Sequence, residues 1–195
     1  MASQMSSEEL ERQFNPRVTV PDFQQYLDRA AAASRQARAT YPALLDVRYG
    51  PGPRQLVDIF PAEDPEAPAL VFVHGGFWRA LSKDAFSGLA GALRPQGITT
   101  VLVGYDLCPT VTLDALVDEI TDAIAWSQTS LVSQGLRPRR LVLAGTSAGA
   151  HLIAMALSRR SVQSIDGVCL VSGIYDLAPV LRISVNTDIQ LDESS

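Results

Sequence analysis

The segment Gly145-Thr146-Ser147-Ala148-Gly149 has the pattern G-x-S-x-G, in which a serine stands between two glycines. A serine hydroxyl at the tip of a sharp strand-to-helix turn can act as a nucleophile, because the turn lifts the hydroxyl above the edge of a sheet. Such a turn needs glycine on both sides, since larger side chains would clash with the neighbouring backbone. We therefore predict that Ser147 is a catalytic nucleophile; an ordinary Gly-Ser turn is the alternative.

A second glycine-containing segment, His74-Gly75-Gly76-Phe77-Trp78, follows an apolar run at 69–73. Acyl transfer builds negative charge on a carbonyl oxygen, and preorganised backbone N–H groups stabilise that charge. Gly75 and Gly76 can supply two of these groups, and the amide of Ala148, at the start of an expected helix, can supply another. The alternative is a tight loop around a packed tryptophan. Together, the two motifs favour acyl transfer more strongly than either does alone.

The elements that must position these motifs alternate along the chain. Apolar, strand-like runs at 69–75, 98–107, 140–146 and 166–176 alternate with helix-like segments at 82–97, 112–135 and 148–160. Continuous apolar strands joined by helices are typical of a parallel sheet with helices on both faces. Two earlier runs, 44–50 and 55–60, flank a glycine- and proline-rich turn and predict an antiparallel pair. Residues 1–40 are expected to form helices apart from the main core.

With these motifs the chain resembles α/β-hydrolases of the esterase/lipase type, and within them the kynurenine formamidase (arylformamidase) group. The segments HGGFW, GTSAGAHL, SGIYDL and YGPGPRQLVDIF carry the resemblance, which covers roughly residues 8–192. It implies an α/β fold of the α/β-hydrolase type, no metal or cofactor, and a small ester or formamide substrate such as an aryl ester or N-formyl-kynurenine. It also implies site residues: Ser147 as nucleophile, an oxyanion hole of Gly75, Gly76 and Ala148, and a substrate pocket lined by Phe77 and Trp78.

The proton-transfer half of such a site is missing from the sequence. A serine nucleophile needs a histidine base and an orienting carboxylate, and the chain has only His74 and His151. We expect His74 to brace the glycine loop, and His151 to lie beside or beneath the serine because it follows one helical turn later. Asp176 is expected to cap a turn rather than to orient a base.

Members of the resembling family place the acid and the histidine on loops after two further strands. We therefore expect a C-terminally incomplete α/β-hydrolase domain at 41–195, preceded by a helical extension at 1–40. The fragment alone should be weakly active or inactive, with an exposed sheet edge that favours poor stability or pairing. Three explanations stay open: a truncated product, one part of a two-chain hydrolase or homodimer, and a catalytically dead binding module.

Composition limits the other functions. The chain has 195 residues, 47% of them hydrophobic, a formal net charge of −5 and no basic block, which argues against nucleic acid or an anionic membrane as partner. Its polar, acidic N-terminus is unlike a secretory signal, and we expect a cytoplasmic protein. Cys108 and Cys169 are expected to be free, buried thiols. A nucleotide-binding domain is disfavoured, because G-x-G-x-x-G and the P-loop pattern are both absent.

Overall fold

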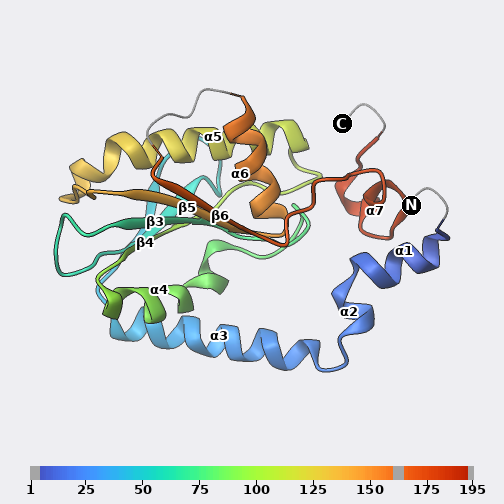
Figure 1. Ribbon diagram of the computed structural model, residues 1–195, viewed down its shortest axis with the longest axis horizontal. Helices are drawn as coiled ribbons and strands as arrows, with labels where there is room; N and C mark the ends of the chain where they lie inside the picture. Colours follow the sequence, from blue (N-terminus) through green and yellow to red (C-terminus); the bar gives the residue numbers. More distant parts are fainter. Residues whose placement is uncertain (1–4, 160–164, 193–195) are drawn as a thin grey trace.

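A six-stranded sheet forms the centre of the computed structural model, which describes residues 5–159 and 165–192 (Figure 1). The strands are β1 (Leu44–Arg48), β2 (Leu56–Phe60), β3 (Ala69–Val73), β4 (Thr99–Val103), β5 (Leu141–Thr146) and β6 (Gly167–Val171). Their order across the sheet is β1-β2-β4-β3-β5-β6. The pairs β4-β3, β3-β5 and β5-β6 are parallel, whereas β1-β2 and β2-β4 are antiparallel. The predicted mostly parallel sheet, with an early antiparallel pair, is confirmed.

Helices cover both faces of this sheet (Figure 1). They are α1 (Ser7–Phe14), α2 (Pro16–Thr19), α3 (Phe23–Thr40), α4 (Gly88–Leu93), α5 (Leu113–Ser130), α6 (Ala148–Ser158) and α7 (Asn186–Ile189). Short 3₁₀ helices are η2 (Lys83–Phe86), η3 (Arg94–Gln96), η4 (Leu131–Gln134) and η5 (Val180–Arg182). α3 and α4 lie on one face, and α5 and α6 lie on the other. Among the described residues, no helix combines the length and the apolar character that crossing a bilayer requires.

The N-terminal helices pack against the rest of the molecule. α1 begins at a capping box, in which Ser6 and Glu9 satisfy each other's backbone N–H groups. Leu10 of α1 is fully buried in the main core. On α3, the Ser34 hydroxyl donates to the carbonyl of Ala85 at 2.8 Å. The N-terminal helices therefore contact the main core, and the expectation that they stand apart from it is wrong. The domain boundary near residue 40 stays a prediction.

The helix expected at 82–97 is broken into three pieces, η2, α4 and η3. Pro95 lacks a backbone N–H and interrupts the α-helical hydrogen bonds near the end of this segment. The segment ends at Gly97, which has a left-handed φ of 71°. The segment therefore ends at Gly97 as expected, but it is not the single continuous helix that the sequence predicted.

The last strand of the sheet, β6, is an edge strand with exposed apolar side chains. Val168 is 45% exposed and Val171 is 52% exposed. An exposed edge was expected here. Cys169 lies on the same strand and is exposed, so the prediction that both cysteines are buried is wrong for Cys169. The reason is that β6 is the last strand of the sheet within the described part of the chain. Cys108 is buried, as predicted.

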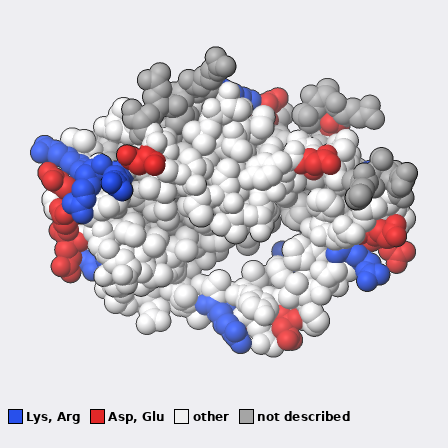
Figure 2. Space-filling model, viewed as in Figure 1, with Lys and Arg blue, Asp and Glu red and all other residues white. Residues whose placement is uncertain are grey.

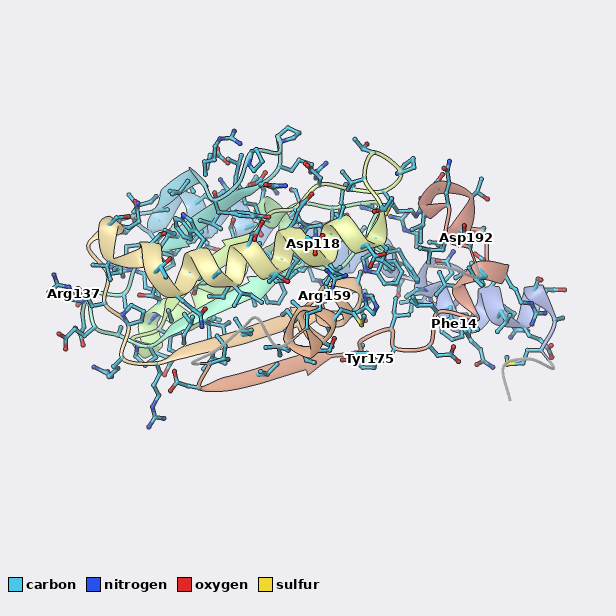
Figure 3. All side chains as sticks on the ribbon, turned by 90° about the horizontal axis from the view of Figure 1, so that it is seen from above. Phe14, Asp118, Arg137, Arg159, Tyr175 and Asp192 are labelled. Carbon is cyan, nitrogen blue, oxygen red and sulfur yellow. The ribbon has the colours of Figure 1, made fainter. Side chains whose placement is uncertain are left out.

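α5 and α6 pack side by side through the main core, and ion pairs link their exposed ends. Arg159, just beyond the end of α6, forms ion pairs with Asp114 and Asp118 on α5. Figure 3 shows the Arg159 and Asp118 side chains between the two helices. All three side chains are partly or largely exposed, so the pairs fix the helix orientation more than they stabilise the fold.

Candidate active site

Ser147 is the single residue that joins β5 to α6. Its φ is 53° and its ψ is −119°, a conformation that non-glycine residues rarely adopt. The Ser147 N–H donates to the carbonyl of Val171 on β6 at 2.8 Å, and its carbonyl accepts from the His151 N–H at 3.1 Å. Strain of this kind costs about 1–3 kcal/mol and persists only where the surrounding structure imposes it. The serine therefore occupies a strained corner, as the G-x-S-x-G pattern predicts.

The two flanking glycines are required by close backbone contacts. A Cβ on Gly149 would lie 2.2 Å from the carbonyl oxygen of Val73 and 2.5 Å from that of His74. A Cβ on Gly145 would lie 2.8 Å from the carbonyl carbon of Gly149. These are backbone atoms that cannot move aside as a side chain can. The turn at Ser147 is thus packed directly against the end of β3, where the His74 loop begins.

The glycine loop lies beside the serine. A Cβ on Gly75 would lie 3.2 Å from the Cβ of Ser147 and 2.9 Å from the carbonyl oxygen of Thr146. Gly76 has a φ of 121°, and it lines the same cavity as Ser147. Ala148 follows the serine as the first residue of α6. The structure therefore brings Gly75, Gly76 and Ala148 together around Ser147, although the two segments are far apart in the sequence.

His74 braces this loop. Its Nδ1 lies 2.7 Å from the carbonyl oxygen of Gly75, and the Tyr105 hydroxyl donates to the His74 carbonyl at 2.7 Å. The ring stacks on Tyr105 at 4.2 Å and on Phe86 at 5.9 Å between centroids. Burial lowers the pKa of His74 to about 4. The ring is therefore neutral at pH 7, and Nδ1–H can donate to the Gly75 carbonyl.

His151 lies below the corner. It is 4% exposed, and burial lowers its pKa. Its Nδ1 has no hydrogen-bond partner among the described residues, and its ring meets the ring of Trp78 edge to face at 5.2 Å. His151 lines a larger cavity of about 590 Å³, not the cavity of Ser147. Tyr175 and Asp192, labelled in Figure 3, also line this larger cavity.

The two aromatic residues of the loop lie in different environments, one in the wall of the cavity and the other in the main core. Phe77 lines the cavity of Ser147, as the resemblance implies for a substrate-pocket residue. Trp78 is 0% exposed, belongs to the main core and is not among the residues that line this cavity. The structure thus differs from the expectation for Trp78, because its indole packs inward against His151.

The cavity of Ser147 has a volume of about 180 Å³ and lies between the glycine loop and residues 15–27, which we call the N-terminal arm. Figure 2 shows the surface hollowed between this arm and the body of the molecule. Sequence reasoning missed most of the wall, which includes Arg17, Phe23, Leu27, Arg79, Leu81 and Val185. No sequence signal marks them, because the wall forms only where the arm, the segment after the glycine loop and Val185 come together in the fold.

A buried charge cluster supports the segment after the loop. The Lys83 ammonium donates to Asp46 at 2.6 Å, Asp58 at 2.7 Å and Asp84 at 3.1 Å, and Arg38 of α3 bonds to Asp58 and Asp84. Burial acts to lower the pKa of Lys83, but its hydrogen bonds to Asp46 and Asp58 outweigh burial and raise it. Sequence reasoning did not predict this cluster, whose members lie on α3, β1, β2 and η2.

Other polar groups near the site have structural contacts. Asp176 accepts the Ala178 N–H at 3.1 Å, the turn-forming contact expected for it. Within the described part of the chain, neither histidine hydrogen-bonds to the Ser147 hydroxyl. Across residues 5–159 and 165–192, no cluster of three His, Cys, Asp or Glu side chains could hold a metal ion.

Comparison with known proteins places this geometry in a family context. A family model described as alpha/beta hydrolase fold matches residues 70–193. Kynurenine formamidases from Danio rerio and Salmo salar are each 34% identical over 202 residues, which cover 97% of this chain. The chain spans 68% and 67% of the length of these two relatives. Kynurenine formamidase from Drosophila melanogaster is 36% identical over 72% of this chain, which spans 49% of that protein.

Two solved structures resemble this chain in fold. A candidate thioesterase from Silicibacter sp. tm1040 is 30% identical and matches with a TM-score of 0.84, covering 95% of this chain and 71% of that one. Esterase B from Lactobacillus rhamnosis matches with a TM-score of 0.63 at 20% identity, covering 84% of this chain and 61% of that one. The second match bears on the fold alone.

Proposed function

The chain belongs to the α/β-hydrolase family and is similar to the kynurenine formamidases within it, and from that premise we propose a serine hydrolase with Ser147 as nucleophile. Its substrates are small acyl or formyl esters and amides, such as aryl esters or N-formyl-kynurenine. One observation carries the proposal: Ser147 occupies a strained strand-to-helix corner with the backbone of the glycine loop against its Cβ.

In the proposed reaction, the Ser147 hydroxyl oxygen attacks the carbonyl carbon of the substrate and its proton passes to a base. The N–H groups of Gly75, Gly76 and Ala148 stabilise the oxyanion that forms, and each such donor contributes about 10²–10³-fold in kcat. The tetrahedral intermediate expels the alcohol or amine, which takes up the proton, and leaves an acyl or formyl ester on Ser147. Water then hydrolyses this ester and regenerates the serine.

The base in this mechanism is neither of the two histidines. His74 is held by the Gly75 carbonyl and two aromatic rings, and His151 packs against Trp78 below the corner. A base must therefore approach the hydroxyl from the cavity side of Ser147. An oxyanion hole alone retains part of the rate enhancement when triad members are absent, so weak turnover is compatible with the proposal.

The test is the Ser147→Ala variant. We expect it to lose hydrolysis of p-nitrophenyl acetate and N-formyl-kynurenine, together with modification by a fluorophosphonate, which mass spectrometry of the peptide detects. Ser158→Ala, at the exposed far end of the same helix, should retain both signals. Equal modification of wild type and Ser147→Ala would refute the proposal, as would the absence of both modification and hydrolysis in a form of the protein extended with a histidine-bearing C-terminal part.

A binding module without turnover is the second candidate, because neither histidine contacts the Ser147 hydroxyl. It predicts ligand binding in the cavity of Ser147 that is unchanged by Ser147→Ala, with no covalent modification of the wild type. A cytoplasmic location, and a homodimer or a completing second chain, stay predictions.

A further inference from the structure

The larger cavity beside His151 is distinct from the cavity of Ser147, and the proposed reaction does not use it. Its volume of about 590 Å³ lies within the range of about 300–1,000 Å³ that is usual for small-molecule sites. Most of its lining residues are apolar. They come from the region around the start of α5, from α6 and from the segment after β6, and they include Val111, Leu113, Val117, Met155, Leu177 and Ile189. The cavity therefore has the size and the lining of a ligand site.

His151 is the buried polar group of this cavity. The residue is 4% exposed, and its Nδ1 has no hydrogen-bond partner among the described residues. Burial lowers the pKa of His151, so the ring is neutral at pH 7 and has one donor and one acceptor nitrogen. Buried polar groups in native structures are nearly always satisfied, by protein or by a bound molecule. A ligand hydroxyl suits either ring nitrogen, because it both donates and accepts.

The exposed end of the cavity is acidic. Asp114, whose side chain is 80% exposed, and Asp192 are in its wall, and the described wall contains no Lys or Arg. Arg159 lies outside the wall and pairs with Asp114 and Asp118 together. One guanidinium thus faces two carboxylates, which leaves this end of the cavity negative. A cationic group is therefore favoured there over an anionic one.

One wall of the cavity is held in a fixed shape. Gln190 ends α7 with φ 60° and ψ 40°, a left-handed conformation that is uncommon for residues other than glycine. The Asn186 side chain accepts the Leu191 N–H at 2.8 Å and donates to the Leu191 carbonyl at 3.1 Å. These contacts secure the turn on both sides of the strained residue. A ligand would therefore meet a preformed wall, which lowers the entropic cost of binding.

We propose that this cavity is a second binding site, which takes a small aromatic ammonium compound with a hydroxyl group on its ring. The hydroxyl hydrogen-bonds to the buried His151 ring, and the aromatic ring of the ligand contacts the apolar wall. The ammonium lies at the exposed acidic end, where Tyr175, 59% exposed, also offers an aromatic face to a cation. The site uses neither Ser147 nor the glycine loop, so it does not depend on the proposed function.

The test compares three probes by isothermal titration at low ionic strength. Tyramine has the hydroxyl, the ring and the ammonium; 3-(4-hydroxyphenyl)propanoate has a carboxylate in place of the ammonium, and phenethylamine lacks the hydroxyl. We expect tyramine to bind about fivefold more tightly than either of the other two, as for one exposed charge interaction or one hydrogen bond. Added salt should weaken the preference over the carboxylate and leave the preference over phenethylamine unchanged.

Two substitutions separate the contributions of the hydroxyl and the ammonium. His151→Phe keeps an aromatic ring against Trp78 and should make tyramine and phenethylamine bind equally. Asp114→Asn should reduce the preference for tyramine over the carboxylate probe. Asp64→Asn is its matched control, because Asp64 also pairs with a partly exposed arginine, Arg139, but does not line the cavity.

A third substitution tests the location of the site without altering a buried polar group. Met155 is 39% exposed and lines the cavity, so Met155→Trp should fill part of it and weaken tyramine binding at least tenfold. Val132→Trp, at a residue that is 50% exposed and outside the cavity wall, should bind tyramine as wild type does. No binding of tyramine by wild type, equal affinity for the three probes, or equal binding by Met155→Trp and Val132→Trp would overturn the proposal.

Discussion

Gly149→Ala tests whether the serine corner is packed against the glycine loop. Gly149 lies in the first turn of α6, where alanine normally stabilises a helix by about 1 kcal/mol relative to glycine. Its new Cβ would, however, lie 2.2 Å from the carbonyl oxygen of Val73 and 2.5 Å from that of His74. Relieving this overlap must move the end of β3 or the start of α6, and overpacking of this kind costs about 1–3 kcal/mol or more. We therefore expect net destabilisation.

Equilibrium urea unfolding followed by circular dichroism measures this change as a shift in midpoint at constant slope. Gly91→Ala in α4 is the matched control, since its Cβ would meet only Tyr41, at 3.9 Å, within the described structure. It should gain up to about 1 kcal/mol of stability. The two substitutions thus have opposite expected signs. A Gly149→Ala protein as stable as wild type, or more stable, would refute the close packing of the corner on the loop.

Two further predictions concern groups that support the loop. Lys83→Met leaves Arg38 as the one ion-pair partner of the fully buried Asp58 among the described residues, and it should cost about 3 kcal/mol in urea unfolding. Asp46→Asn, at an exposed carboxylate, should cost about 1 kcal/mol or less. A similar cost for both would contradict the burial argument. Burial lowers the pKa of His74 to about 4 from 6.5, so the unfolded chain binds a proton first as pH falls. The contribution of His74 to the free energy of unfolding should therefore be complete above pH 6.5 and should fall by about 3 kcal/mol as the pH approaches 4. Unfolding curves measured across this range should show a steeper decline for the wild type than for His74→Phe.

The parts of the fold that sequence could predict are those fixed by local rules. Continuous apolar runs ended by glycine identified β3 and β5, and helical periodicity identified α5. The G-x-S-x-G spacing predicted the strained corner because a sharp strand-to-helix turn at a serine needs glycine on both sides. The position of the glycine loop beside Ser147 follows from the pairing of β3 with β5, in which Val73 stands opposite Gly145.

The remaining features depend on contacts between distant segments. Trp78 was expected in the pocket from the family resemblance, but its indole is fully buried in the core and packs against His151. Cys169 is apolar in context, yet its exposure depends on which strand ends the sheet. Arg17 and Phe23 carried no signal at all, because an amphipathic N-terminal segment does not reveal which surface it folds against.

The pairing of β3 with β5 has a consequence for how such a site diversifies. The corner and the loop are made of main chain at the ends of two adjacent strands, and they approach each other closely where Gly75 and Gly149 carry no side chain. Their relative position thus follows from the pairing of the two strands, and the side chains of His74 and Tyr105 brace it. The arm that forms the opposite wall is a separate piece of chain, so substitutions in it can change which ligands fit the cavity while the backbone of the corner and the loop keeps its arrangement.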